Sequence, residues 1–177
     1  MKHAHRLITA SVFVLSMATS ASAQGVALAG DMLKDWQQQK ATMVAIADAM
    51  PEDKFGYKST PPQRSYGEQV MHVVQVNQML LGTLGGKTAA PAINMKATSR
   101  ADILNALRQS YDYGETLFKE FNDAAWVQSV AGPRFIGQAT RARIANFAMT
   151  HTMDIYGQMV VYLRLNNIVP PASRREN

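Results

Sequence analysis

"THTMDIYGQMVVYLRLNNIVPPASR", residues 150–174, predicts the second half of a long amphipathic helix with a sharp end. Asn166 or Asn167 can take the left-handed conformation that often follows a helix, and the Pro-Pro pair at 170–171 forbids further helix. Upstream and through this stretch, inward-facing residues recur at alternating intervals of four and three, which places them on one helical face: Ile144, Ala148, His151, Ile155, Gln158 and Tyr162. We therefore expect a helix over residues 140–166.

Three further segments have the same apolar periodicity, over residues 31–50, 65–84 and 99–121. Asp31 can cap the first, Ser65 and Glu68 form a capping box at the second, and Ser99 with Asp102 opens the third. No segment shows a convincing strand pattern. Four helices of similar length predict an all-α fold, an antiparallel four-helix bundle.

The segment between the third and fourth helices lacks a regular pattern. It contains a Gly-Pro turn at 132–133 and two large aromatic residues, Trp126 and Phe135. We expect this segment to be irregular, with both aromatic side chains folded back onto the edge of the bundle.

Residues 1–23 have the features of a secretory signal peptide: a basic start, an apolar run diluted by serine and threonine, and an Ala-Ser-Ala end. Cleavage is predicted before Gln24, which leaves residues 24–177 as one bundle domain. An uncleaved anchor is the alternative, but the run falls short of the ~20 apolar residues that a spanning helix needs. We expect a protein that is exported to the periplasm or secreted, without a stable membrane anchor.

Composition excludes several kinds of chemistry. The chain has no cysteine, so disulfides, cysteine nucleophiles and thiolate metal sites are ruled out. The net charge of +5 is spread along the sequence without a run of lysine and arginine, so we expect no nucleic-acid partner. Of the four histidines, His3 and His5 leave with the signal peptide, and His72 and His151 remain.

His72 and His151 are the candidate site residues. They lie on the second and fourth predicted helices, and inward side chains on facing helices are how bundles build metal sites. The alternative is that both are histidines of the core or its rim that bind no ion. No G-x-S-x-G, phosphate-binding glycine loop or H-E-x-x-H motif is present.

Two stretches resemble the DinB/YfiT-like family. "MPEDKFGYKSTPPQRSYGEQVMHVV", residues 50–74, resembles its linker and second helix. "HTMDIYGQMVVYLRLNNIVPPASR", residues 151–174, resembles its last helix and tail, where the pattern is close to H-x-x-x-H-[RY]-G-Q. The resemblance implies a four-helix bundle, often with a divalent metal held by three histidines. Members of the family include thiol transferases and many proteins without a known activity.

Carried over by position, the resemblance gives His72 as the first ligand and His151 as the second. The third ligand falls on Ile155, which has no lone pair to donate, while Gly157 and Gln158 match the rest of the motif. Asp154 is the obvious substitute, but the family has Asp there beside an intact third histidine, which favours a position at the rim. Two imidazoles can still hold zinc or nickel, more weakly than three ligands do.

We therefore expect an exported DinB-like protein with a degenerate metal site, in a binding or accessory role toward an unidentified small molecule. The first alternative is a divalent-metal-dependent hydrolase or transferase that uses His72 and His151. The second is a purely structural bundle that forms a homodimer.

Overall fold

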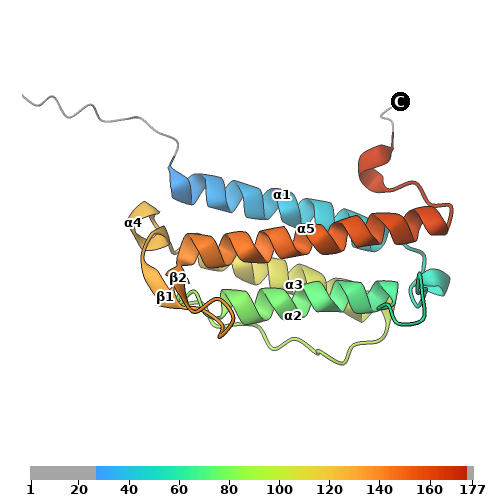
Figure 1. Ribbon diagram of the computed structural model, residues 1–177, viewed down its shortest axis with the longest axis horizontal. Coiled ribbons are helices and arrows are strands. Elements are labelled where there is room, and N and C mark those ends of the chain that lie inside the picture. The colour runs from blue at the N-terminus through green and yellow to red at the C-terminus, as the bar shows by residue number, and fades with distance from the viewer. Residues whose placement is uncertain (1–26, 175–177) are drawn as a thin grey trace, which may run out of the picture.

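The computed structural model describes residues 27–174 and contains four long helices packed side by side (Figure 1). They are α1 (Leu28–Asp48), α2 (Tyr66–Leu81), α3 (Arg100–Phe118) and α5 (Arg141–Leu165). This confirms the all-α bundle predicted from the spacing of apolar residues. The predicted signal peptide, residues 1–23, lies outside the described range. None of the helices within that range is long and apolar enough to cross a membrane.

The direction of the chain in the bundle differs in part from the antiparallel expectation. The neighbouring helices α1 and α3 are antiparallel, and so are α2 and α5, but α2 and α3 run in the same direction (Figure 1). Along α2 and α3, Gly67 lies beside Ile103 and Asn77 bonds to Ser110, so both numbers rise together. The reason is the long connection over residues 82–99, which returns the chain along the bundle before α3 begins.

Short elements close one end of the bundle. After α3 come α4 (Asp123–Trp126) and an antiparallel pair, β1 (Ser129–Ala131) and β2 (Gln138–Thr140), in which Val130 faces Ala139. No strand was expected here, because strands of three residues are too short to show alternation. Trp126 is fully buried against Phe118 and Phe121, as expected. Phe135 also folds back onto the bundle edge, where its ring packs on Phe147 of α5, but it stays 61% exposed.

The predicted caps of α2 and α3 are confirmed. Ser65 and Glu68 form a reciprocal capping box, and the Ser99 side chain accepts from the Asp102 backbone N–H. Asp31 is not a cap, because α1 begins at Leu28 and places Asp31 inside its first turn. The start of α1 is instead held from outside the helix, where the Ala29 N–H donates to the Asp123 carboxylate of α4 at 2.8 Å.

Helices α2 and α5 end close to the glycine, asparagine and proline residues that were expected to stop them. Helix α2 ends at Leu81, earlier than expected, and Gly85 then takes a positive φ of 71°. Helix α5 is capped by Thr140 and is followed by Asn167 with φ 60°, the left-handed residue that the sequence predicted. Two 3-10 turns, η1 (Glu52–Lys54) and η2 (Pro171–Ser173), complete the chain.

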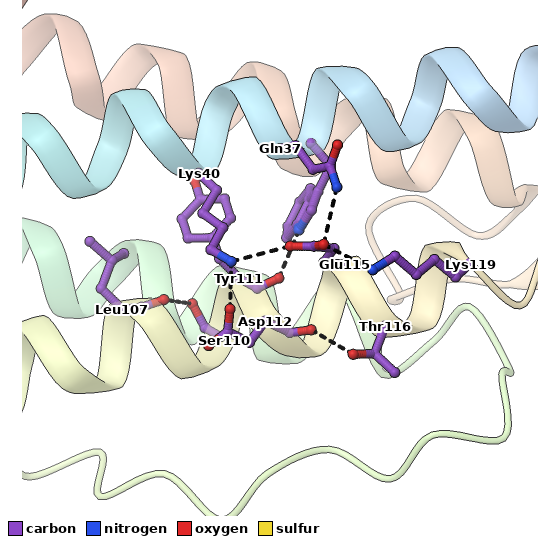
Figure 2. Close-up of polar contacts among 10 residues, drawn as sticks. Gln37, Lys40, Leu107, Ser110, Tyr111, Asp112, Glu115, Thr116 and Lys119 are labelled. Atoms are coloured by element: carbon purple, nitrogen blue, oxygen red, sulfur yellow. Dashed lines mark hydrogen bonds and ion pairs between the residues drawn. The ribbon is translucent and has the colours of Figure 1, made fainter.

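Polar contacts align α1 with α3 along one side of the bundle (Figure 2). Lys40 reaches from α1 to Asp112 at 2.5 Å and to Glu115 at 3.2 Å. Gln37 and Lys119 also bond to Glu115, at 3.0 and 2.9 Å. Lys40, which interrupts the apolar pattern of α1, therefore has its partners on the facing helix.

Candidate functional site

The two candidate histidines meet at the interface between α2 and α5. The Nε2 atoms of His72 and His151 are 3.1 Å apart, and the ring planes cross at 78°. Both side chains are half-buried, at the rim of the bundle rather than in its centre. Because α2 and α5 are antiparallel, a second pair also meets along this interface: Gln69, one turn before His72, donates to Gln158, two turns after His151, at 2.8 Å.

Aromatic side chains pack beside the histidine pair on α5. His72 lies two turns after the Ser65 cap of α2. His151 lies one turn after Phe147 on α5, and the two rings are nearly parallel, with centroids 6.4 Å apart. Phe135 of the hairpin packs in turn on Phe147, at 5.6 Å between centroids. An aromatic wall therefore flanks the histidine pair on the α5 side.

The surroundings of His72 favour a neutral imidazole. Burial is the main cause that lowers its pKa, and the positive charge of Arg64 and the neighbouring His151 lower it further. A hydrogen bond with Gln75 opposes this shift but does not reverse it. A neutral imidazole keeps one nitrogen lone pair, which is what a metal ion or a hydrogen-bond donor requires.

The distance between the two Nε2 atoms fits a shared metal ion. Zinc lies at 2.0–2.1 Å from imidazole nitrogen, so two such ligands are about 3.3 Å apart at a tetrahedral angle and about 2.9 Å apart at a right angle. The observed 3.1 Å lies between these values. The same distance also suits a hydrogen bond between one N–H and the other lone pair. His72 and His151 can therefore hold either a proton or a metal ion between them.

A third ligand does not join the pair. Ile155, at the family's third position, is 2% exposed and belongs to the apolar core. Asp154 is exposed, and its carboxylate accepts a hydrogen bond from Gln158 at 3.2 Å. Across residues 27–174, no three His, Cys, Asp or Glu side chains come close enough to hold one ion. Asp154 thus belongs to the polar chain that runs through Gln158 to Gln69.

A cavity of about 720 Å³ opens beside His72, between the start of α2 and the segment that leads into α3. Its lining includes Arg64, which lies in the linker before α2. Neither Arg64 nor Phe147 was predicted as a site residue from the sequence. For Phe147 a signal was present, since it precedes His151 by one helical turn. For Arg64 there was none, because a linker residue has no periodicity that places it.

Comparisons with known proteins agree with this architecture. A sequence model described as the DinB superfamily matches residues 35–159. No curated protein matches the chain significantly. Among solved structures, a DinB-like protein from Bacillus cereus ATCC 10987 is similar with a TM-score of 0.66 and 18% identity, over 82% of this chain and 96% of that one.

A DinB-like protein from Bacillus subtilis is similar with a TM-score of 0.65 and 16% identity, over 82% of this chain and 99% of that one. At these identities the structural likeness concerns the fold alone. The match of the family to residues 35–159 extends from α1 to α5 and includes both histidines. On that match and this bundle, the chain belongs to the DinB superfamily.

Proposed function

We propose that this protein is an exported binding protein whose site is the pair His72 and His151, and which takes up a divalent metal ion weakly. The contact of 3.1 Å between the two Nε2 atoms carries the proposal. Imidazole is a preferred ligand of zinc and nickel, and these two Nε2 atoms are close enough to share one ion. A zinc ion held there would act as a Lewis acid with its remaining positions open to water or a ligand.

The surroundings of the histidine pair favour weak metal binding, and a binding role over a catalytic one. Structural zinc sites have four protein ligands and catalytic ones have three, whereas this pair has two. The third position is filled by Ile155, whose side chain is buried in the core. A stable three-ligand centre of the kind that positions a reactive water is therefore not formed by the described side chains.

The metal-dependent hydrolase or transferase remains the second candidate, because one observation favours it. The cavity beside His72 offers room for a small substrate next to the ion. Metal affinity separates the two proposals, since a catalytic site of this class holds its ion through purification.

The experiment is a metal titration on protein prepared without a His-tag and without chelator. Metal content is measured first by mass spectrometry, and zinc and nickel binding is then followed by calorimetry and melting temperature. We expect little metal after purification and a dissociation constant in the micromolar range or weaker. His72→Ala and His151→Ala should each abolish this binding, while Thr150→Ala, an exposed neighbour on α5, should not change it.

Two outcomes would contradict the proposal. One metal ion per chain that survives purification and is lost in either histidine variant would favour the enzyme. No binding of zinc or nickel in the parent protein would leave a structural role for the bundle, which a measurement of the oligomeric state would then address.

A further inference from the structure

The cavity beside His72 has the size of a small-molecule site. Its volume of about 720 Å³ falls within the ~300–1,000 Å³ of typical ligand pockets. It is bounded by the linker after η1, the first three turns of α2, and the segment that leads into α3. His72 reaches its edge, but His151 does not line it. The cavity is therefore adjacent to the histidine pair and not the same site.

Three cationic side chains, Lys58, Arg64 and Arg100, and two carboxylates, Glu52 and Glu68, line this cavity. Two of the three cationic side chains have carboxylate partners. Lys58 is 3.5 Å from the Glu68 carboxylate. Arg100 bonds to the Asp48 carboxylate at 2.9 Å, and to carbonyl groups at the end of α1. For Arg64, by contrast, the described chain has no carboxylate within ion-pair distance. A guanidinium group at the edge of a cavity without an acidic partner favours an anionic ligand.

The position of Arg64 is fixed at its backbone. Its carbonyl accepts a hydrogen bond of 2.7 Å from the Tyr162 hydroxyl of α5, which ties the linker to the bundle. Its side chain is one of those that line the cavity, as is that of His72. The amino-terminal ends of α2 and α3, at Ser65 and Ser99, also border the cavity, where the carboxylates of Glu68 and Asp102 in the first turns offset the positive ends of the helix dipoles.

The rest of the lining is apolar in part. Met71 of α2 and Met95 of the connection line the cavity together with Phe55 and Ile103. Methionine side chains adapt to ligands of different shape, and Met95 is exposed. A ligand that suits both parts carries a negative head group and an apolar body.

We propose that this cavity binds a small carboxylic acid, with its carboxylate on Arg64 and its apolar body against Met71 and Met95. The planar guanidinium fork matches the two carboxylate oxygens and can bind both at once. This goes beyond the proposed metal binding, because the contact with Arg64 requires no ion at the histidine pair.

The test uses phenylacetate and hexanoate as acids of different shape, on protein freed of metal by a chelator that is then removed by desalting. Phenylacetamide is the uncharged counterpart of phenylacetate, and acetate has the head group without the body. Binding to the full-length protein is measured by calorimetry and ligand-observed NMR. We expect at least one of the two larger acids to bind in the millimolar range or tighter. Phenylacetamide and acetate should each bind at least about tenfold more weakly than the larger acid that binds.

Variants connect the binding to the guanidinium. Arg64→Gln should lower the affinity for the acid about tenfold. Arg64→Lys keeps the charge but loses the planar fork, so its affinity should lie between those of Arg64→Gln and the parent. Arg108→Gln removes an exposed arginine of α3 that does not line the cavity and should leave the affinity unchanged. Because the Arg64 side chain is exposed, both of its variants should keep the parent melting temperature.

The proposal is overturned if neither acid binds, if the amide or acetate binds as well as the acids, or if Arg64→Gln binds like the parent. His151→Ala separates it from the proposed metal site, since this variant should lose metal binding and retain the acid. A protein that binds metal but no acid would refute this inference alone.

Discussion

The indole ring of Trp36 lies against the backbone of Gly114, where α1 crosses α3. A Cβ atom built on Gly114 would be 2.3 Å from Cζ2 of that ring. Trp36 is fully buried, and its Nε1–H donates to the Tyr111 carbonyl at 2.9 Å, so the ring has no room to withdraw. Glycine at this position is therefore what lets the two helices approach.

We expect Gly114→Ala to destabilise the protein by about 1–3 kcal/mol, the usual cost of overpacking a core. The loss should occur although alanine favours a helix over glycine by roughly 1 kcal/mol. Gly157→Ala is the matched control, because a Cβ on this exposed glycine of α5 meets no atom within 4 Å and should stabilise the protein. Chemical denaturation of both variants measures the difference. A stable Gly114→Ala variant would mean that α1 and α3 are not in this contact.

The carboxylate of Glu115 predicts a dependence of stability on pH. The hydrogen bond from Lys119, with those from Gln37 and Lys40, lowers the pKa of Glu115 from 4.5 to about 2. A carboxyl group whose pKa is lower in the folded state contributes stability above the unfolded value, and this is lost as the pH falls through the folded value. The contribution should therefore be complete above pH 4.5 and decline toward about pH 2.

Glu115→Gln tests this. The variant should unfold more easily than the parent at neutral pH, and the gap in unfolding free energy should narrow as the pH is lowered from 4.5 to about 2. Asp53→Asn is the control, because this exposed carboxyl group has no ion pair within residues 27–174. A gap that stays constant over this range would show that Glu115 is not held in the network of Figure 2.

The sequence predicted what depends on local pattern and missed what depends on contacts between distant segments. The capping box of Ser65 and Glu68 is a local hydrogen-bonding arrangement, and it was found at the expected residues. The parallel direction of α2 and α3 was missed, because the periodicity of a helix does not indicate the path of the long connection that follows it. The start of α1 was placed too late, since its Ala29 N–H is satisfied by Asp123, far away in sequence.

The same distinction between local pattern and distant contacts applies to the candidate site. Helical spacing alone could place His151 and Ile155 on one inward face. It could not give the distance to His72, which depends on how α2 and α5 align, nor the side chains that surround the pair. Arg64 was missed because its position follows from the linker's hydrogen bond with Tyr162, a contact across most of the chain.

Export is the prediction that concerns the chain before residue 27. The basic start, the apolar run and the Ala-Ser-Ala end should direct cleavage before Gln24. Mass spectrometry of the protein recovered from the producing cells should give a chain that starts at this residue, outside the cytoplasm. Replacing Ala21 and Ala23 with larger residues should block the cleavage. Full-length protein retained in the cytoplasm would refute the prediction.

The last prediction concerns Ile155, one helical turn beyond His151. Residues at i and i+4 lie on the same helical face, so an imidazole at 155 should reach the same point as the Nε2 atoms of His72 and His151. Ile155→His should thus rebuild a site with three histidines. Without metal it should be less stable than the parent by about 1–3 kcal/mol, because Ile155 is buried in the apolar core.

Added zinc or nickel should reverse this loss. An ion that binds only the folded protein stabilises it by about 2.7 kcal/mol when its free concentration is a hundredfold above the dissociation constant. The melting temperature of Ile155→His should therefore rise far more with metal than that of the parent. The double variant Ile155→His with His72→Ala is the control and should lose this gain, because it returns the site to two ligands. An equal rise in the single and double variants would show that residue 155 does not share a site with His72.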